Sequence, residues 1–134
     1  MSDLRRLALP EPITGTVGRC RCFAFDALVD WGWLPGADHR IRLAAQDVLL
    51  VVSELVTNAC LYGGGPVEVA LRRRDGLILV EVSDRDPSPP VLRPVQNGAA
   101  PGGHGLRVVA VVSTAWGSRP RDGGKTVWAE VAAR

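Results

Sequence analysis

The segment from His39 to Leu61 constrains the fold most, because it predicts a long helix that is apolar on almost every side. Apolar residues recur along it at the three- and four-residue spacing of one helical face, and further valines and leucines fill the other faces. A helix of this kind is covered on two sides in a folded protein. Asp38 is a natural N-cap before it, and the run Gly63–Pro66 ends it. The rest of the chain must therefore fold around this helix.

The other predicted elements are shorter, and they include two β-hairpins. Alternating apolar residues and the tight-turn pair Asp75-Gly76 indicate the first hairpin, and the run Asp122–Gly124 forms the turn of the second. In chain order, the expected elements are an extended segment over 4–13, helices over 17–31 and 39–61, a hairpin over 67–82, a helix over 105–114 and a hairpin over 115–131. This order predicts an α+β fold: a two-layer α/β sandwich with a mixed, mostly antiparallel sheet and helices on one face.

The composition is that of an ordinary globular domain, and it excludes several classes of function. The 134 residues suit one domain, 1–134, with a single core, and 46% of them are hydrophobic. A net charge of +2 is too small to indicate direct binding to nucleic acid. No apolar run reaches the roughly 18 residues of a membrane span, and no signal peptide is recognisable. We therefore expect a cytoplasmic protein that does not bind membranes.

Two polar residues on the long helix, Glu54 and Asn58, are the first candidates for chemistry. Four residues advance a helix by about 6 Å and turn it by roughly 40°, so both side chains point from one face into the same space. An amide oxygen on a rigid helix suits Mg²⁺, which usually takes a few protein oxygens together with substrate phosphates. Glu54 lies one turn earlier and can deprotonate a hydroxyl that attacks a phosphoryl group. Taken alone, the pair is as typical of an ordinary arrangement, in which Asn58 is a cap and Glu54 forms a surface salt bridge, as of a functional site.

Three later segments supply the remaining candidates for a nucleotide site. Asp84 ends a hydrophobic strand, where a carboxylate can accept a hydrogen bond from the exocyclic amine of adenine. Gly103 and Gly105, followed by Leu106, lead into a helix whose N-terminus favours phosphate. Thr126 opens the last strand, and its hydroxyl can hydrogen-bond near adenine. Each signal alone has an ordinary explanation, namely a turn, a hinge or β-propensity. Their common order and spacing favours a site.

The stretch from Pro87 to Pro101 separates Asp84 from these glycines. It contains five prolines, so it can form neither a helix nor a central strand. A loop of this length in a compact domain is usually a functional lid or disordered. We expect a lid between the sheet and the last helix.

Together these residues resemble the ATP-binding superfamily of histidine kinases, gyrase and related chaperones, and within it the small anti-sigma-factor serine/threonine kinases of bacteria. The most specific element is the run Glu54–Ala59, in which an acidic residue precedes a magnesium-binding asparagine by four positions. The resemblance covers almost the whole chain and implies a Bergerat-type ATP-binding fold with ATP and Mg²⁺ as cofactors. It makes Glu54 the catalytic base and Asn58 the magnesium ligand.

The resemblance also implies roles for the later candidates. The adenine-binding aspartate of the family falls on Asp84, its phosphate-lid glycines fall on Gly103 and Gly105 beside Leu106, and its late threonine falls on Thr126. These five residues would therefore bind the nucleotide.

The implied function is regulation of transcription. The protein would transfer the γ-phosphoryl group of ATP to a serine or threonine of an anti-anti-sigma (STAS-type) partner, bind a sigma factor, or do both, and a homodimer is compatible with the resemblance. A catalytically inactive protein-binding module of the same fold is the alternative. Asp86 favours it, because the family often has glycine there and a side chain brings bulk and charge toward the base. A third interpretation is an unrelated α/β sandwich with a fortuitous match.

Overall fold

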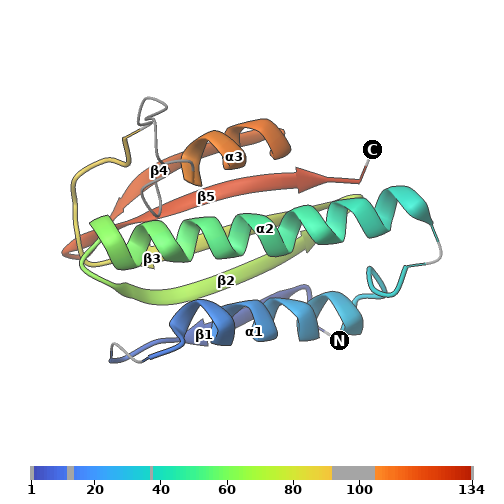
Figure 1. Ribbon diagram of the computed structural model, residues 1–134, viewed down its shortest axis with the longest axis horizontal. Helices are drawn as coiled ribbons and strands as arrows, with labels where there is room; N and C mark the ends of the chain where they lie inside the picture. The colour runs from blue at the N-terminus through green and yellow to red at the C-terminus, as the bar shows by residue number, and fades with distance from the viewer. Residues whose placement is uncertain (1, 12–13, 37, 92–104, 134) are drawn as a thin grey trace.

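The computed structural model describes residues 2–11, 14–36, 38–91 and 105–133. In these ranges the chain forms three helices and five strands (Figure 1). They are β1 (Leu4–Ala8), α1 (Thr16–Asp30), α2 (His39–Tyr62), β2 (Pro66–Arg74), β3 (Leu77–Asp84), α3 (Gly105–Val112), β4 (Ala115–Arg121) and β5 (Gly124–Ala132). Every expected element is present, although the first strand is shorter than the expected extended segment.

The five strands form one sheet in the order β1-β2-β3-β5-β4. β5 lies between β3 and β4, so the chain leaves β3, forms α3 and the outer strand β4, and only then returns beside β3. All the strand pairings in the described part of the chain are antiparallel, where we expected a mixed, mostly antiparallel sheet. The register of β3 and β5 places Asp84 opposite Lys125 and Ser83 opposite Thr126.

The three helices cover one face of this sheet and form the second layer (Figure 1). α2 packs against β2, β3 and β5, while α1 contacts α2, β1 and β2, and α3 contacts α2 and β4. α2 therefore has the sheet on one side and a helix on each flank, as its apolar surface requires. The expected two-layer sandwich with helices on one face is confirmed.

The core lies between α2 and the sheet. The buried residues of α2 are Ala44, Ala45, Val48, Val51, Val52, Leu55, Val56 and Ala59. They meet fully buried strand residues such as Leu71, Ile78 and Val80. By length and mean hydropathy alone α2 would also qualify as a membrane span. Its packing against the sheet and two helices accounts for that apolar composition within the fold.

Local signals fix both ends of α2. The carboxylate of Asp38 accepts a hydrogen bond from the backbone N–H of Arg40 at 2.7 Å, which confirms the expected N-cap. At the other end the N–H of Gly63 donates to the carbonyl of Ala59 at 3.0 Å. This stop places the last turns of the helix, with Asn58, beside the ends of β3 and β5.

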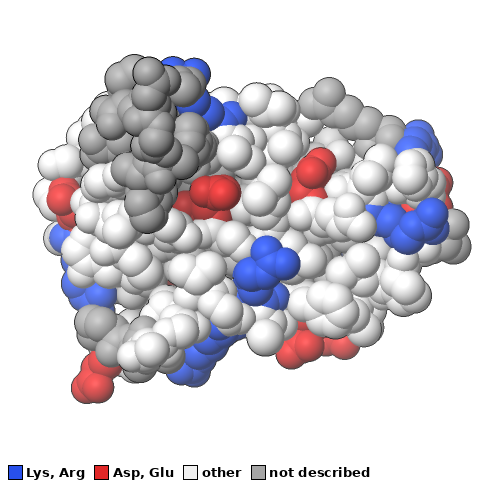
Figure 2. All heavy atoms as spheres, in the orientation of Figure 1, with Lys and Arg blue, Asp and Glu red and all other residues white. Residues whose placement is uncertain are grey.

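The two faces of the molecule differ in their use of charge. On the helical side, Figure 2 shows charged side chains scattered singly among uncharged ones. On the sheet side, Glu81 forms ion pairs with both Arg72 and Arg119. Burial alone would raise the pKa of Glu81, but hydrogen bonds from the two arginines hold that pKa below its ordinary value. On this face two arginines therefore share one buried glutamate.

Truncating Leu28 tests whether α1 is part of the same core as α2. Leu28 is fully buried, so Leu28→Ala should lower the free energy of unfolding by about 2–5 kcal/mol through lost burial and a cavity. Leu43 is 47% exposed on α2, and Leu43→Ala is the matched control, with an expected change of about 0.5 kcal/mol or less. Urea unfolding followed by circular dichroism measures both. Equal losses in the two variants would contradict this packing.

Candidate functional site

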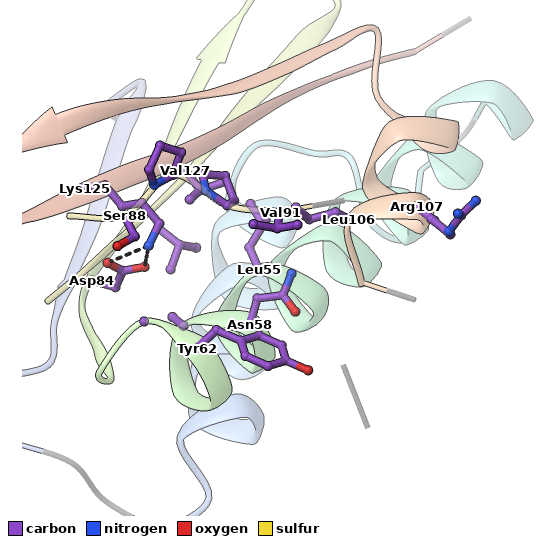
Figure 3. A pocket seen from close by; sticks show the side chains of 15 residues that line it. Leu55, Asn58, Tyr62, Asp84, Ser88, Val91, Leu106, Arg107, Lys125 and Val127 are labelled. Atoms are coloured by element: carbon purple, nitrogen blue, oxygen red, sulfur yellow. Dashed lines mark hydrogen bonds and ion pairs between the residues drawn. The ribbon is translucent and has the colours of Figure 1, made fainter. Parts of the chain in front are cut away.

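A cavity of about 160 Å³ opens between the helical layer and one end of the sheet (Figure 3). Its walls come from the end of α2, the ends of β3 and β5, the first turn of α3, and the segment that follows β3. The residues that line it are Leu55, Asn58, Ala59, Tyr62, Gly63, Val82, Asp84, Ser88, Pro89, Pro90, Val91, Leu106, Arg107, Lys125 and Val127. Figure 3 shows Asp84 and Lys125 together at one side, Arg107 far from them, and Asn58 between.

Asn58 contributes a polar group that the protein leaves unsatisfied. Its Oδ1 atom is buried and has no hydrogen-bond partner among the described residues. Buried amide oxygens nearly always have a partner, so this atom is available to a ligand. The first residue of α3, Gly105, lies against the amide, because an added Cβ there would stand 2.9 Å from Oδ1 and from Nδ2. The absence of a side chain on Gly105 therefore keeps the space beside Asn58 open.

Asp84 and Lys125 form a buried ion pair in the cavity wall. The Lys125 Nζ atom lies 2.9 Å from Oδ2 of Asp84 and 3.2 Å from Oδ1. The pair forms because the two residues stand opposite each other in the register of β3 and β5. Gly63 lies directly behind the carboxylate, where an added Cβ would stand 2.7 Å from Cγ of Asp84. The glycine that ends α2 thus also makes room for this aspartate.

The backbone after β3 completes the hydrogen bonding of this pair. The N–H of Asp86 donates to Oδ1 of Asp84 at 3.0 Å, and Nζ of Lys125 donates to the carbonyl of Asp86 at 3.0 Å. The carboxylate of Asp86 accepts from the N–H of Ser88 at 2.8 Å. Hydrogen bonds from Ser88, assisted by the charge of Lys125, hold the pKa of Asp86 below its ordinary value.

Asp86 itself is not among the residues that line the cavity. We expected its side chain to bring bulk and charge toward a bound base. The structure corrects this expectation, since the carboxylate is held by the N–H of Ser88 instead.

Glu54 lies one turn before Asn58 on α2, as expected from the spacing. It is half-buried, and in the described part of the chain it has no hydrogen bond or ion pair. It does not line the cavity, so the structure brings it to the side of Asn58 without placing it in the cavity wall.

Thr126, whose hydroxyl we expected to hydrogen-bond near adenine, does not line the cavity. Neighbouring residues of a strand point to opposite faces, so Lys125 and Thr126 cannot both face the helices. The Thr126 hydroxyl lies 2.8 Å from that of Ser83, and both line a hollow on the outer face of the sheet. Of these two neighbours, Lys125 is the one that lines the cavity.

The expected lid is only partly described. Gly103 and most of the stretch from Pro87 to Pro101 lie outside the described residues, and their expected roles stay predictions. The described part, from Ser88 to Val91, lines the cavity. Gly105 and Leu106 lie where expected, at the start of α3, and Leu106 lines the cavity while Gly105 borders Asn58.

Sequence reasoning missed Lys125 and Tyr62 as parts of the cavity. Tyr62 is the last residue of α2, where the sequence gives no sign of which way its ring points. One pattern in the sequence could have identified Lys125. This lysine is two positions before Val127, so the apolar alternation of the last strand places it on the helix-facing side.

The buried pair gives a stability test. Lys125→Met should lower the free energy of unfolding by about 3–5 kcal/mol, because it leaves the Asp84 carboxylate buried without its counter-charge. The double variant Asp84→Asn/Lys125→Met removes both charges and should recover most of that loss. Arg121→Met is the matched control: it removes a cation from the exposed ion pair with Glu68 and should cost about 1 kcal/mol or less. Urea unfolding checks all three. A double variant as unstable as Lys125→Met would contradict this explanation.

The family model of the histidine kinase-like ATPase domain matches residues 37–131, which include every residue of the cavity wall. Comparison with curated proteins gave no match. The matched range is more than two thirds of the chain, and the antiparallel sheet with helices on one face agrees with the fold of that family. The chain belongs to the histidine kinase-like ATPase domain family.

Proposed function

We propose that this protein binds ATP with Mg²⁺ and transfers the γ-phosphoryl group to a serine or threonine of an anti-anti-sigma (STAS-type) protein, as part of a switch that controls a sigma factor. One observation carries the proposal. In a domain of the histidine kinase-like ATPase family, the buried Oδ1 atom of Asn58 has no partner among the described residues and faces the glycine that begins α3. A water or a ligand can complete this group, and nucleotide phosphates with a hard cation are suited to it.

The residues at this point fit a magnesium ion that is held mainly by ligand oxygens. In the described ranges no three His, Cys, Asp or Glu residues gather into a site of their own. Asn58 would thus be the protein ligand, which agrees with the usual way in which Mg²⁺ takes few protein oxygens and several from phosphates and water. When bound, the ion neutralises charge on the phosphates.

The cavity also supports one orientation of the nucleotide. Its apolar walls, among them Leu55, Val82 and Val127, suit the faces of a base, with the Asp84 carboxylate at the end of β3 as an acceptor for an exocyclic amine. The phosphates would then extend toward Asn58 and the start of α3. The N-terminus of a helix favours negative charge, and Gly105 lets the backbone approach.

Glu54 is the proposed base for the transfer. The substrate hydroxyl gives its proton to the Glu54 carboxylate while its oxygen forms a bond to the γ-phosphorus. The bond from that phosphorus to the bridging oxygen breaks, and ADP leaves. Glu54 lies beside the cavity and not in its wall, which suits a base that meets a hydroxyl arriving from a separate protein.

A second candidate is a protein-binding module of the same fold that performs no chemistry. The observation that favours it is the ion pair of Asp84 with Lys125, because the proposed adenine acceptor already has a partner at 2.9 Å. Calorimetric titration with Mg-ATP separates the candidates, since only the first requires nucleotide binding.

The whole proposal is tested by mixing the protein with Mg-ATP and candidate anti-anti-sigma proteins. Mass spectrometry then measures phosphate on the partner, and gel filtration measures the complex. Phosphate on a partner serine or threonine supports the transferase. Complexes that form without nucleotide, with no phosphate incorporated, favour the binding module.

Asn58→Ala tests the metal ligand. The variant should weaken binding of Mg-ATP, and metal-free ATP should be affected less, because the lost oxygen serves the ion. Calorimetry with and without Mg²⁺ makes the measurement. Thr57→Ala, which truncates the neighbouring polar residue on the same helix outside the cavity, is the control and should leave the magnesium dependence unchanged. An unchanged magnesium dependence in Asn58→Ala would refute the assignment.

Glu54→Gln tests the base. The substitution keeps size and hydrogen bonding but removes the proton acceptor, and a positioned base typically contributes about 100- to 10,000-fold in rate. Transfer measured with radiolabelled ATP should fall by that order while the Kd for nucleotide persists. Glu130→Gln on β5, away from the cavity, should transfer at the parental rate. If Glu54→Gln does so too, Glu54 is not the base.

A further inference from the structure

Lys125 is a buried charged group in the cavity wall that the proposed transfer does not use. It is the only lysine of the sequence, in which arginine supplies the rest of the Lys and Arg cations. Its side chain is 8% exposed, and that of Asp84 is 4% exposed. The chain therefore places its one lysine in a buried position, where lysine is rare unless it is paired.

Stability does not explain this buried pair. Desolvating two charges costs about as much as their attraction returns, and apolar residues of similar volume are often neutral or better at such positions. Position 125 continues the buried apolar row of β5, with Val127 and Ala129 next in line. An apolar side chain would thus suit the core, and the lysine needs another reason.

The contacts of Lys125 leave it a donor for a ligand. An ammonium group has three N–H donors. The two oxygens of Asp84, at 2.9 and 3.2 Å, can share one of them, and the carbonyl of Asp86 at 3.0 Å takes a second. The third remains, and Lys125 lines the cavity. The cavity therefore offers an acceptor on Asp84 directly beside a donor on Lys125.

Resting on the ATP binding proposed above, we propose that Lys125 determines base specificity by donating a hydrogen bond to the ring nitrogen N1 of adenine. On the edge of adenine the amino group, a hydrogen-bond donor, lies next to N1, a hydrogen-bond acceptor. Asp84 accepts from the amino group while Lys125 donates to N1. The pair is neutral in sum, which suits an uncharged base. Both members of the ion pair thus contact the edge of adenine, and the pairing does not prevent Asp84 from accepting the amino group.

The test on the unaltered protein compares Mg-ATP with its 1-deaza analogue, in which a C–H replaces N1. Loss of the acceptor leaves a charged N–H unpaired in a buried place, so the Kd should rise about tenfold or more. Calorimetry measures both. Equal Kd values for the two nucleotides would overturn the role of Lys125. Mg-GTP is a second comparison, because guanine carries a hydrogen-bond donor at N1. A Kd for Mg-GTP as low as that for Mg-ATP would also overturn the proposal.

Variants then assign the effect to the residue. Lys125→Met should bind Mg-ATP more weakly and lose the discrimination against the 1-deaza analogue. If that variant does not fold, Asp84→Asn/Lys125→Met replaces it with the same expected loss of discrimination. Arg121→Met removes a cation elsewhere and should discriminate as the parent does. Discrimination that persists in a variant without Lys125 would overturn the proposal.

The outcomes separate this inference from the function on which it rests. If the parent binds none of the nucleotides, both fail. A different set of results refutes only the role of Lys125. In that case the parent binds Mg-ATP, Asn58→Ala removes the magnesium dependence of binding, and the parent binds the 1-deaza analogue with the same Kd as ATP. The nucleotide site then stands without a role for Lys125.

Discussion

The packing of α2 on the sheet is the contact on which the rest of this structure depends. Eight residues of the helix are buried between the central strands and the two flanking helices, and together with the strand residues that they cover they supply most of the core. The same contact sets the position of the last turns of α2 relative to the ends of β3 and β5. The distance between Asn58 and the Asp84–Lys125 pair is therefore a property of the core. A site built on a helix and two strands in this way is held more rigidly than one built on loops.

The elements could be predicted because their signals are local. The period of α2, the cap at Asp38 and the tight turn at Asp75-Gly76 each lie within a few residues of the structure that they determine. The two-layer architecture followed from the apolar surface of one helix. The strand order was not predicted, because the insertion of β5 between β3 and β4 depends on pairing between distant segments. No local pattern carries that information.

The residues of the candidate site fall into the same two groups, those with a local signal in the sequence and those that depend on contacts between distant segments. Asn58 and Asp84 were found because each sits at a marked point of its own element, near a helix end and at a strand end. Lys125 was missed and Thr126 chosen in its place, although the alternation of Val127 and Ala129 already indicates the face of each. The orientation of Asp86 depends on a hydrogen bond from Ser88, which spacing alone does not reveal. Contacts between elements, rather than the elements themselves, set the limit of the prediction.

Successive residues of β5 point to opposite faces of the sheet. Val127, Ala129 and Val131 must face the helices, so odd-numbered positions of the strand point to the helical side and even-numbered positions point to the outer face. The residue at position 125 therefore meets the cavity whatever its chemistry. Exchanging the neighbours Lys125 and Thr126 would leave the composition and the net charge of the protein unchanged. It would nevertheless carry a positive charge through the sheet, and a hydroxyl would replace an ammonium group at the end of the cavity.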